Sequence, residues 1–512
     1  MEQHLGESSG TRFPLRGYER AFTVADHGSV KTSYVMAIQG SNDALTALIV
    51  HLPQALVLTF NRHPRMRAMQ VRGEFATAEI QPKITLETIV EKKLLEIRVT
   101  EQDSQGKTWE QYAETQANLP LDRFTELPYY FSVWHYPGES RVRLCMCSDH
   151  YMSDGVSSMA VLNDVVTFAS ELSREEQGQT SSQILAFAKE ELPLRPSFLE
   201  MWLDVNSWSV FAGRMILKAL RRTLLTAEST QFKPVIPLRA DQADMSIPVK
   251  LNSSSILFAQ GTPENMKSAL QRCKEEGVTL FGALAAVAIA AFYVCCDDEE
   301  KRNSTSSSFK LGFEVVANMR NRVRAPVPEV QVGAYMLSNE LASLKTEGVD
   351  MSAVSFWNLA RKSRNEVDAN FAGLFGPMRL LFADDFMNTN LTPEDLEGVR
   401  IPHSVSADLM ISNIGKYAYP TTHVFQTGSP SRQLQDLKIE SVHSGGSFPH
   451  TGTAVTLFVT SIDALSFGFM HKYEDTLGRK LFEAMIKGIE RIGQVSRDET
   501  MAQVAHAVQQ AL

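Results

Sequence analysis

Three residues whose types suit acid–base chemistry lie close together in one short stretch: His150, Asp154 and Gly155. An imidazole titrates near neutral pH, so His150 could accept a proton from a hydroxyl or an amine. A histidine followed four residues later by an aspartate is common by chance in a chain with 12 histidines. A glycine directly after that aspartate lowers the chance expectation to about 0.04 per chain. The simpler interpretation is a turn histidine followed by an aspartate that caps the next helix.

The surrounding sequence favours the catalytic interpretation. Residues 141–148 alternate between polar and apolar side chains and predict a strand, whereas 157–172 carry apolar residues at helical spacing. The motif therefore lies in a loop between two rigid elements, which can hold a reactive side chain in place. Gly155 is expected to permit the tight turn into the helix.

The other histidines are weaker candidates. A second pair with the same spacing, His471 and Asp475, lacks the glycine, and His471 is expected on a strand near the surface. His63 is expected to be a structural histidine at a helix end. His443 and His450 flank a glycine-rich stretch, which we interpret as a mobile loop rather than as a wall of the site.

The composition is that of a globular protein with more than one domain: 512 residues, 44% hydrophobic and 21% charged. The formal charge of −9 disfavours general binding to nucleic acid, which requires a cationic surface, so no nucleic-acid partner is expected. Five cysteines without a C-x-x-C pair predict reduced thiols in a cytoplasmic protein. No metal site is expected.

Strands and helices alternate in both halves of the chain, which predicts an α/β protein. Strands are expected at 30–39, 67–74, 94–100, 129–135, 141–148, 309–317, 409–413, 453–461 and 465–471. Helices are expected at 43–62, 157–172, 278–296, 353–370 and 477–494. The stretch 277–296 is uncharged and long enough to cross a bilayer. Because acidic residues flank it and alanines fill it, we interpret it as a buried core helix.

Composition shifts divide the chain. We expect an N-terminal domain at 14–180, an interdomain helix and linker at 181–245, a C-terminal domain at 246–495, and tails at 1–13 and 496–512. Residues 197–225 carry many large apolar side chains and end on basic residues. We interpret this segment as an interdomain helix that covers the core, with peripheral membrane contact as the alternative.

The motif at 150–155 resembles the His-x-x-x-Asp-Gly motif of the chloramphenicol acetyltransferase-like, CoA-dependent acyltransferases. This superfamily includes BAHD enzymes, wax ester synthases, alcohol acetyltransferases and condensation domains of peptide synthetases. Four further segments resemble family motifs in matching order, so the resemblance spans about 14–495: residues 62–67 ("HP-x-LR"), 277–280 with the helix that follows, 316–322 ("N-x-R") and 412–415 ("SN-x-G").

Two departures bear on the branch. Condensation domains usually carry two consecutive histidines, whereas Asp149 precedes His150 here, and the BAHD motif DFGWG is absent. The alcohol acetyltransferase-like branch is therefore nearest, beside the condensation-domain and wax ester synthase-like branches.

The resemblance implies two chloramphenicol acetyltransferase-like domains, each a mixed sheet with flanking helices, and an interdomain tunnel with His150 at its middle. It implies that His150 is the general base and that Asp154 is structural and pairs with an arginine, for which we expect Arg320. Ser412 or Asn413 are candidate donors to the oxyanion. The implied cosubstrate is a coenzyme A thioester, and the acceptor is a small-molecule alcohol or amine, acylated on oxygen in our working prediction without a covalent acyl-enzyme.

Two alternatives remain open at this point. One is condensation-type formation of an ester or amide from a carrier-protein thioester. The other is a catalytically silent relative that only binds a ligand, against which the intact motif argues. The acceptor, the acyl chain length and the oligomeric state do not follow from the sequence.

Overall fold

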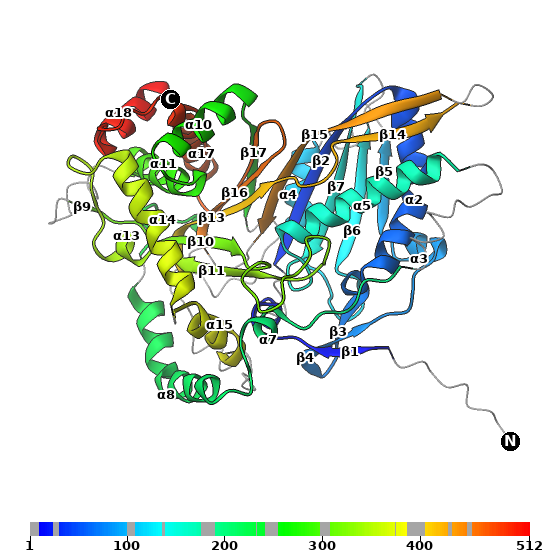
Figure 1. The fold of residues 1–512 in the computed structure, drawn as a ribbon, viewed down its shortest axis with the longest axis horizontal. Helices are drawn as coiled ribbons and strands as arrows, with labels where there is room; N and C mark the ends of the chain where they lie inside the picture. Colours follow the sequence, from blue (N-terminus) through cyan, green and yellow to red (C-terminus); the bar gives the residue numbers. More distant parts are fainter. Residues whose placement is uncertain are drawn as a thin grey trace.

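The computed structural model describes residues 10–23, 30–99, 108–135, 139–175, 190–231, 233–240, 254–296, 308–373, 375–386, 405–428, 433–447 and 453–512. These residues form two α/β lobes side by side, and each lobe is built around a mixed six-stranded sheet (Figure 1). The α/β class predicted from the sequence is confirmed.

The first sheet contains the strand that leads to His150. Its strands are β2 (Lys31–Gln39), β5 (Leu95–Val99), β6 (Tyr129–His135), β7 (Arg141–Asp149), β14 (Thr422–Thr427) and β15 (Gln433–Ser447). They lie in the order β14–β15–β2–β7–β6–β5, and every neighbouring pair is antiparallel except β5 with β6.

Helices cover both faces of this sheet. On one face, α2 (Asn42–Arg62) and α5 (Gly155–Ser173) bury their apolar side chains together with those of the strands. The Ser41 hydroxyl caps α2 by accepting from the amide of Ala44 at 3.3 Å. On the other face, α4 (Trp109–Asn118) packs Tyr112 and Ala113 beside Val35 of β2. Because successive strand residues point to opposite faces, this sheet is buried on both sides.

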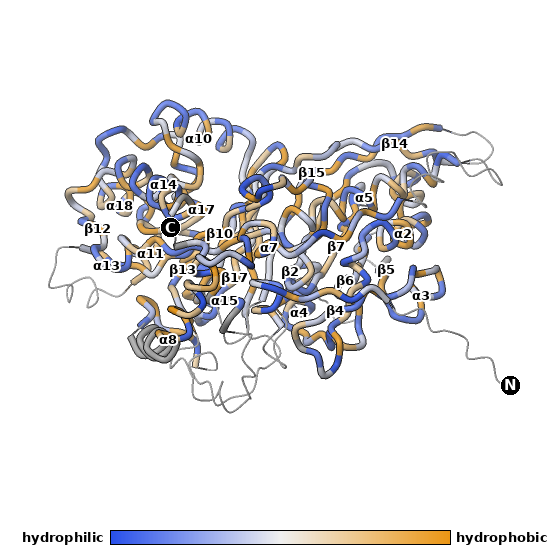
Figure 2. Tube along the Cα trace, turned by 60° about the horizontal axis from the view of Figure 1, so that its bottom comes forward, coloured by the Kyte–Doolittle hydropathy of each residue, from blue (hydrophilic) through white to orange (hydrophobic). Residues whose placement is uncertain are grey.

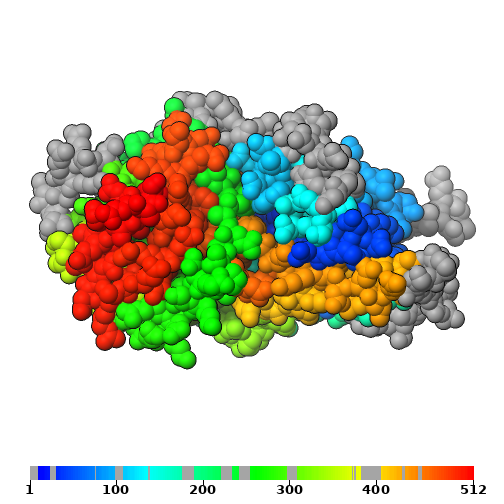
Figure 3. All heavy atoms as spheres, turned by 90° about the horizontal axis from the view of Figure 1, so that it is seen from above, coloured from blue at the N-terminus to red at the C-terminus, as the bar shows by residue number. Residues whose placement is uncertain are grey.

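Part of the first sheet comes from the second half of the chain. β15 pairs with β2 in an antiparallel register that sets Val442 opposite Met36, and β14 extends the edge beyond it. Figure 3 shows the molecule from above, with orange C-terminal residues lying against blue N-terminal residues. The expected division at 246 therefore needs a correction, because strands within 246–495 complete the sheet of the other lobe. Pairing between strands so far apart leaves no local signal.

The second sheet has parallel strands at its centre. Its strands are β8 (Ser255–Gln260), β10 (Phe313–Asn318), β11 (Met336–Glu340), β13 (Ala407–Lys416), β16 (Thr453–Ser461) and β17 (Leu465–His471). They lie in the order β11–β10–β13–β16–β17–β8, with β13 parallel to both β10 and β16.

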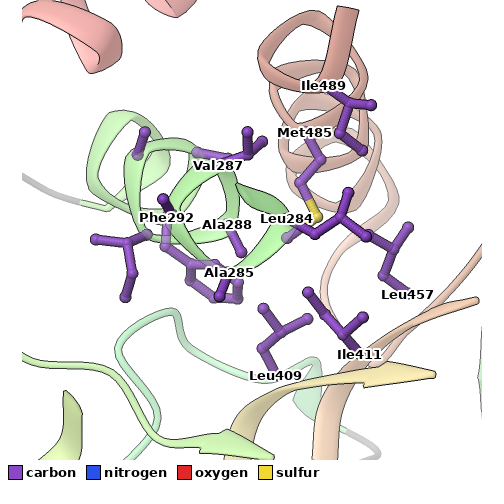
Figure 4. Close-up of a cluster of buried hydrophobic side chains, with 14 of the residues drawn as sticks. Leu284, Ala285, Val287, Ala288, Phe292, Leu409, Ile411, Leu457, Met485 and Ile489 are labelled. Carbon is purple, nitrogen blue, oxygen red and sulfur yellow. The ribbon is translucent and has the colours of Figure 1, made fainter. Parts of the chain in front are cut away.

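A helical layer packs on one face of the second sheet. Its central helix is α11 (Leu280–Cys295), which lies among α14 (Phe356–Ala372), α17 (Asp475–Arg491) and α18 (Met501–Ala511). Figure 4 shows Leu284 and Ala288 of α11 between Met485 of α17 and the strand residues Leu409 and Ile411. The uncharged stretch is thus a core helix, as predicted.

Length and hydropathy alone would let α2 cross a bilayer, and the bent pair α10 (Pro263–Glu275) and α11 passes the same test together. In the structure, Leu45, Leu48 and Leu52 of α2 are buried in the core of the first lobe. The apolar character of α2 and α11 is accounted for by this packing.

Several sequence predictions are wrong in detail. The segment 496–512 is not a tail, because α18 buries Met501 and Val504 in the second core. The lead-in 1–13 ends in a strand, β1 (Arg12–Pro14), which pairs with β4 (Glu74–Ile80). The expected strand 309–317 is two strands, β9 (Ser308–Phe309) and β10.

The segment 197–225 is also not one helix. It folds as α7 (Phe198–Trp202) and α8 (Trp208–Gln231), and α8 packs on α15 (Phe375–Phe386) rather than over a sheet. The remaining elements are α1 (Tyr18–Ala21), η1 (Pro64–Arg67), β3 (Ala68–Val71), α3 (Leu86–Glu91), α13 (Ala342–Thr346), β12 (Val349–Asp350) and η2 (Ile492–Gln494).

Candidate active site

His150 lies in the loop that joins β7 to α5, and only 8% of its surface is exposed. Its backbone amide donates to the carbonyl of Val30 at 2.8 Å, which ties the loop to the residue before β2. Its Nδ1 atom lies 2.6 Å from the carbonyl oxygen of Ser153. Because a carbonyl oxygen can only accept, Nδ1 carries the proton, and the lone pair of the neutral ring lies on Nε2.

The surroundings of His150 favour the neutral ring. The ring of Phe22 stacks on the imidazole, with centroids 4.6 Å apart and planes 12° apart. Burial lowers the pKa of His150, although the Ser153 carbonyl and the charge of Asp154 act in the opposite direction. A base with a lowered pKa is unprotonated at neutral pH and ready to accept a proton.

Asp154 is held by Arg320 of the second lobe, the partner that the resemblance implies. The two guanidinium nitrogens donate to the two carboxylate oxygens at 2.7 and 2.9 Å, and both residues are buried. Burial raises the pKa of Asp154, but the Arg320 charge and the hydrogen bonds from Arg320 and Ser157 outweigh it, so the pKa lies below its usual value. Asp154 is therefore ionised at neutral pH.

The carboxylate of Asp154 also accepts hydrogen bonds from two backbone amides. The amide of Ser157 donates at 2.8 Å, so Asp154 is the N-cap of α5, and the amide of Tyr335 donates at 2.9 Å from the second lobe. The Ser157 hydroxyl adds a bond to the carboxylate at 2.8 Å and lies 2.9 Å from the carbonyl of Gly333. We call Asp154, Ser157, Tyr335 and Arg320 the interdomain clamp. Asp154 thus serves to join the two lobes beside His150.

Gly155 is needed for a different reason than the sequence suggested. It is the first residue of α5 and does not have a positive φ, so no turn there demands glycine. A Cβ atom at this position would lie 2.8 Å from side-chain carbons of Ile414 on β13. Glycine therefore permits the close approach of the two lobes at the motif.

Ser412 and Asn413 are consecutive residues of β13, so their side chains lie on opposite faces of the strand. Ser412 pairs with Phe458, a member of the apolar cluster that Phe22 packs against, and with Val316, which packs against the same cluster. Asn413 follows on the opposite face of the strand, the side of Ile411 in the helical core. Since Phe22 stacks on His150, Ser412 is the better candidate to face a reacting group.

Asp149, the residue directly before His150, carries a buried carboxyl group with an altered pKa. It is fully buried, and its Oδ2 atom lies 3.7 Å from a guanidinium nitrogen of Arg123. Burial raises its pKa to about 6, against the opposing charges of Arg123 and Lys31. Its signal in the sequence was its position beside His150. Phe22 had no such signal, because its contact with the ring depends on tertiary folding.

The remaining histidines have other surroundings. His63 at the end of α2 bonds to a carboxylate oxygen of Asp164 at 2.8 Å, which fits the expected structural role. His443 is not in a mobile loop: it lies within β15, buried beside the rings of Trp109 and Phe258, which also contact each other. His450 falls outside the described residues.

His471 was expected near the surface and is instead buried at the end of β17. Its ring lies under Gly478, where a Cβ atom would come within 2.2 Å of the imidazole. Burial lowers the pKa of both His443 and His471 to about 4, so both are neutral at pH 7.

Solved structures resemble the whole chain. A trichothecene 15-O-acetyltransferase, TRI3, of Fusarium sporotrichioides matches with a TM-score of 0.67 and 12% identity over 96% of this chain and 97% of that chain. The first condensation domain of the calcium-dependent antibiotic synthetase matches with a TM-score of 0.58 and 13% identity over 97% and 99%. Polyketide synthase associated protein 5 from Mycobacterium tuberculosis matches with a TM-score of 0.55 and 14% identity over 94% and 99%.

No protein-family model matches the sequence, and no curated protein matches it. The likeness to solved structures nevertheless covers both lobes in each case. The chain therefore shares its two-domain fold with a solved acetyltransferase and with solved condensation domains.

Proposed function

We propose that the protein transfers an acyl group from a thioester to the hydroxyl of a small acceptor, with His150 as general base. The observation that carries this proposal is the bond from Nδ1 of His150 to the Ser153 carbonyl. It leaves the basic lone pair on Nε2 of a ring whose pKa is lowered. The fold shared with an acetyltransferase and with condensation domains supports the same class of reaction.

In the proposed reaction, Nε2 of His150 accepts the proton of the acceptor hydroxyl as its oxygen attacks the thioester carbonyl carbon. The tetrahedral intermediate then collapses, the carbon–sulfur bond breaks, and the imidazolium returns its proton to the leaving thiolate. The products are an ester and a free thiol, so atoms and charges balance without a covalent acyl-enzyme. Asp154 takes no proton in this scheme, because Arg320 and two amides hold it as a carboxylate.

Ser412 is the proposed donor to the oxyanion of the intermediate. It shares a face of β13 with Met410, in the apolar cluster next to the ring that stacks on His150. A hydroxyl in apolar surroundings stabilises developing negative charge more strongly than one in water. Asn413, on the other face, is not proposed as a donor.

We propose coenzyme A as the thiol of the donor and an alcohol as the acceptor, from the sequence resemblance. A second candidate is condensation with a carrier-protein thioester, favoured by the similarity to condensation domains. Both use the same histidine chemistry and differ in the group that carries the thiol.

A thiol-release assay tests the proposal. Acetyl-CoA, longer acyl-CoAs and an acylated carrier protein are each offered with a panel of alcohols and amines, to wild type and to His150→Ala. We expect release that depends on acceptor and donor and that falls by about 10²–10⁴-fold in the variant. Turnover with the carrier donor alone would establish the second candidate. Equal rates in both proteins would reject His150 as the base.

A further inference from the structure

Helix α8 carries an unusual concentration of exposed apolar side chains. Trp208 is 78% exposed, and Phe211 and Met215 are each 52% exposed. Ile216 and Leu220 are exposed on the same helix. Five of the twelve large apolar side chains that are exposed in the described part of the chain thus lie within 13 residues. The other seven are scattered: Val50, Leu86, Val90, Ile97, Leu270, Leu434 and Leu512.

The helix is anchored by a different face. Val210 and Leu217 are buried in the cluster that joins α8 to α15. Gly213, between them, approaches Leu381, where a Cβ atom would lie 3.4 Å from a side-chain carbon. Residues three and four positions apart share a helix face, so this buried stripe lies away from the stripe of Trp208, Phe211 and Met215. We call that second stripe the α8 apolar face.

The amino-acid sequence of α8 is cationic over the same stretch. The sequence from Trp208 to Ala227 contains four basic residues and no aspartate or glutamate: Arg214, Lys218, Arg221 and Arg222. Arg214 pairs with Asp384 at 2.9 Å, whereas Lys218 is exposed. At 100° per residue, Lys218 projects beside Phe211. Apolar and aromatic side chains flanked by cations are the features of a helix that lies in a membrane interface.

We propose that α8 docks the protein on an anionic lipid surface, with the α8 apolar face in the boundary between headgroups and acyl chains. The helix lies at the edge of the molecule in two views, Figure 1 and Figure 2. The rings of Trp208 and Phe211 lie 5.2 Å apart and present one continuous aromatic surface. Indole rings favour the headgroup level of a bilayer.

Charge complementarity favours lipid over a second copy of the chain as the occupant. Two α8 apolar faces packed together would bring like charges from both helices into proximity, because this stretch carries cations only. An anionic bilayer offers the opposite charge, worth about fivefold in binding per lysine or arginine near the surface.

The test is flotation of the full-length protein with vesicles of phosphatidylcholine alone and with added phosphatidylserine. The variant W208S/F211S/M215S removes the α8 apolar face. The matched control V50S/V90S/L434S removes three equally exposed apolar side chains elsewhere. Lys218→Glu tests the electrostatic part, and His150→Ala shows that docking is independent of the reaction. Sedimentation of each protein without lipid gives its oligomeric state.

We expect wild type, the matched control and His150→Ala to float with phosphatidylserine vesicles. The α8 variant should bind at least about tenfold more weakly, and Lys218→Glu should bind more weakly in low salt only. Equal binding by the α8 variant and wild type would overturn the proposal. Failure of wild type to bind either kind of vesicle would also overturn it. In that case, a wild-type dimer that the α8 variant disrupts would identify a second copy of the chain as the occupant.

Discussion

The chain contains two histidine–aspartate pairs of identical spacing, each at the point where a strand leads into a helix. His150 and Asp154 follow β7 and precede α5, whereas His471 and Asp475 lie at the end of β17 and the start of α17. In the first pair, a carbonyl holds one ring nitrogen and Arg320 holds the carboxylate. In the second, neither ring nitrogen has a hydrogen-bond partner among the described residues, and Asp475 is exposed beside Ser255.

Two histidine–aspartate pairs of equal spacing can therefore have very different surroundings. His150 lies beside the junction of the two lobes, where Arg320 and Tyr335 of the second lobe hold Asp154 and Ile414 packs on Gly155. His471 lies inside one lobe, closed over by Gly478. What separates the pairs is the set of contacts that fix a tautomer and lock a carboxylate.

The largest expected difference between the two histidine–aspartate pairs is in the free energy of unfolding of their variants. Arg320→Met leaves Asp154 as a buried, uncompensated charge, which should cost about 3–5 kcal/mol of unfolding free energy. Asp475→Asn, on an exposed residue, should change it by less than about 0.5 kcal/mol. Urea denaturation at pH 7 measures both. Similar changes in unfolding free energy for the two variants would show that Arg320 does not stabilise the junction through Asp154.

The clamp also predicts a pH dependence. The pKa of Asp154 is lowered in the folded protein, so its ionised form stabilises the fold at neutral pH. That contribution is complete above its unfolded pKa and is lost as pH falls through the folded value. Arg320→Met should therefore lose less stability on acidification below about pH 4 than wild type does.

The next difference contrasts two neighbours on β13. Ser412→Ala removes the proposed oxyanion donor and should lower kcat on the order of 10²-fold. Asn413→Ala, on the opposite face, should keep kcat within about threefold of wild type. Steady-state thiol release measures both. A larger loss for Asn413→Ala would exchange their assignments.

A smaller effect should appear in the pH profile. Because burial lowers the pKa of His150, the neutral base persists below the ordinary histidine value of 6.5. The acid limb of kcat/KM should therefore have its midpoint below pH 6.5, with a flat rate between pH 7 and 8. A midpoint above 6.5 would contradict the assignment, since it would require a stabilised imidazolium.

The smallest expected effect concerns the residue before the base. Asp149 has a pKa raised to about 6 from 3.8, so its ionisation destabilises the fold as pH rises through that window. Asp149→Asn should therefore be relatively more stable than wild type at pH 7.5 than at pH 4. Thermal unfolding at both values measures this, and a reversed order would show that Arg123 and Lys31 overcome burial.

Local pattern predicted much of the fold. The strands at 129–135, 453–461 and 465–471 were predicted at their observed bounds, because alternation and turn residues are local signals. The helix α11 was recognised as core from its alanines and acidic flanks. By contrast, β15 was missed, because its pairing with β2 joins segments about 400 residues apart in sequence.

The candidate site shows the same division between local signals and long-range contacts. His150, Asp154 and Gly155 were found from one local motif, and Arg320 came from the family resemblance. The packing of Gly155 on Ile414, the stack of Phe22 and the burial of His471 depend on tertiary contacts that no short stretch encodes. The exposure of α8 likewise required the structure, because the sequence favoured an interdomain helix that covers the core.

The proposed general base is His150 and not His471, its counterpart in the second pair. The most direct measurement compares acceptor-dependent thiol release by wild type, His150→Gln and His471→Leu, each first shown to be folded by circular dichroism. We predict a loss of about 10²–10⁴-fold for His150→Gln and a rate within about threefold of wild type for folded His471→Leu. Full activity in His150→Gln, or a loss of thiol release confined to folded His471→Leu, would reject His150 as the base.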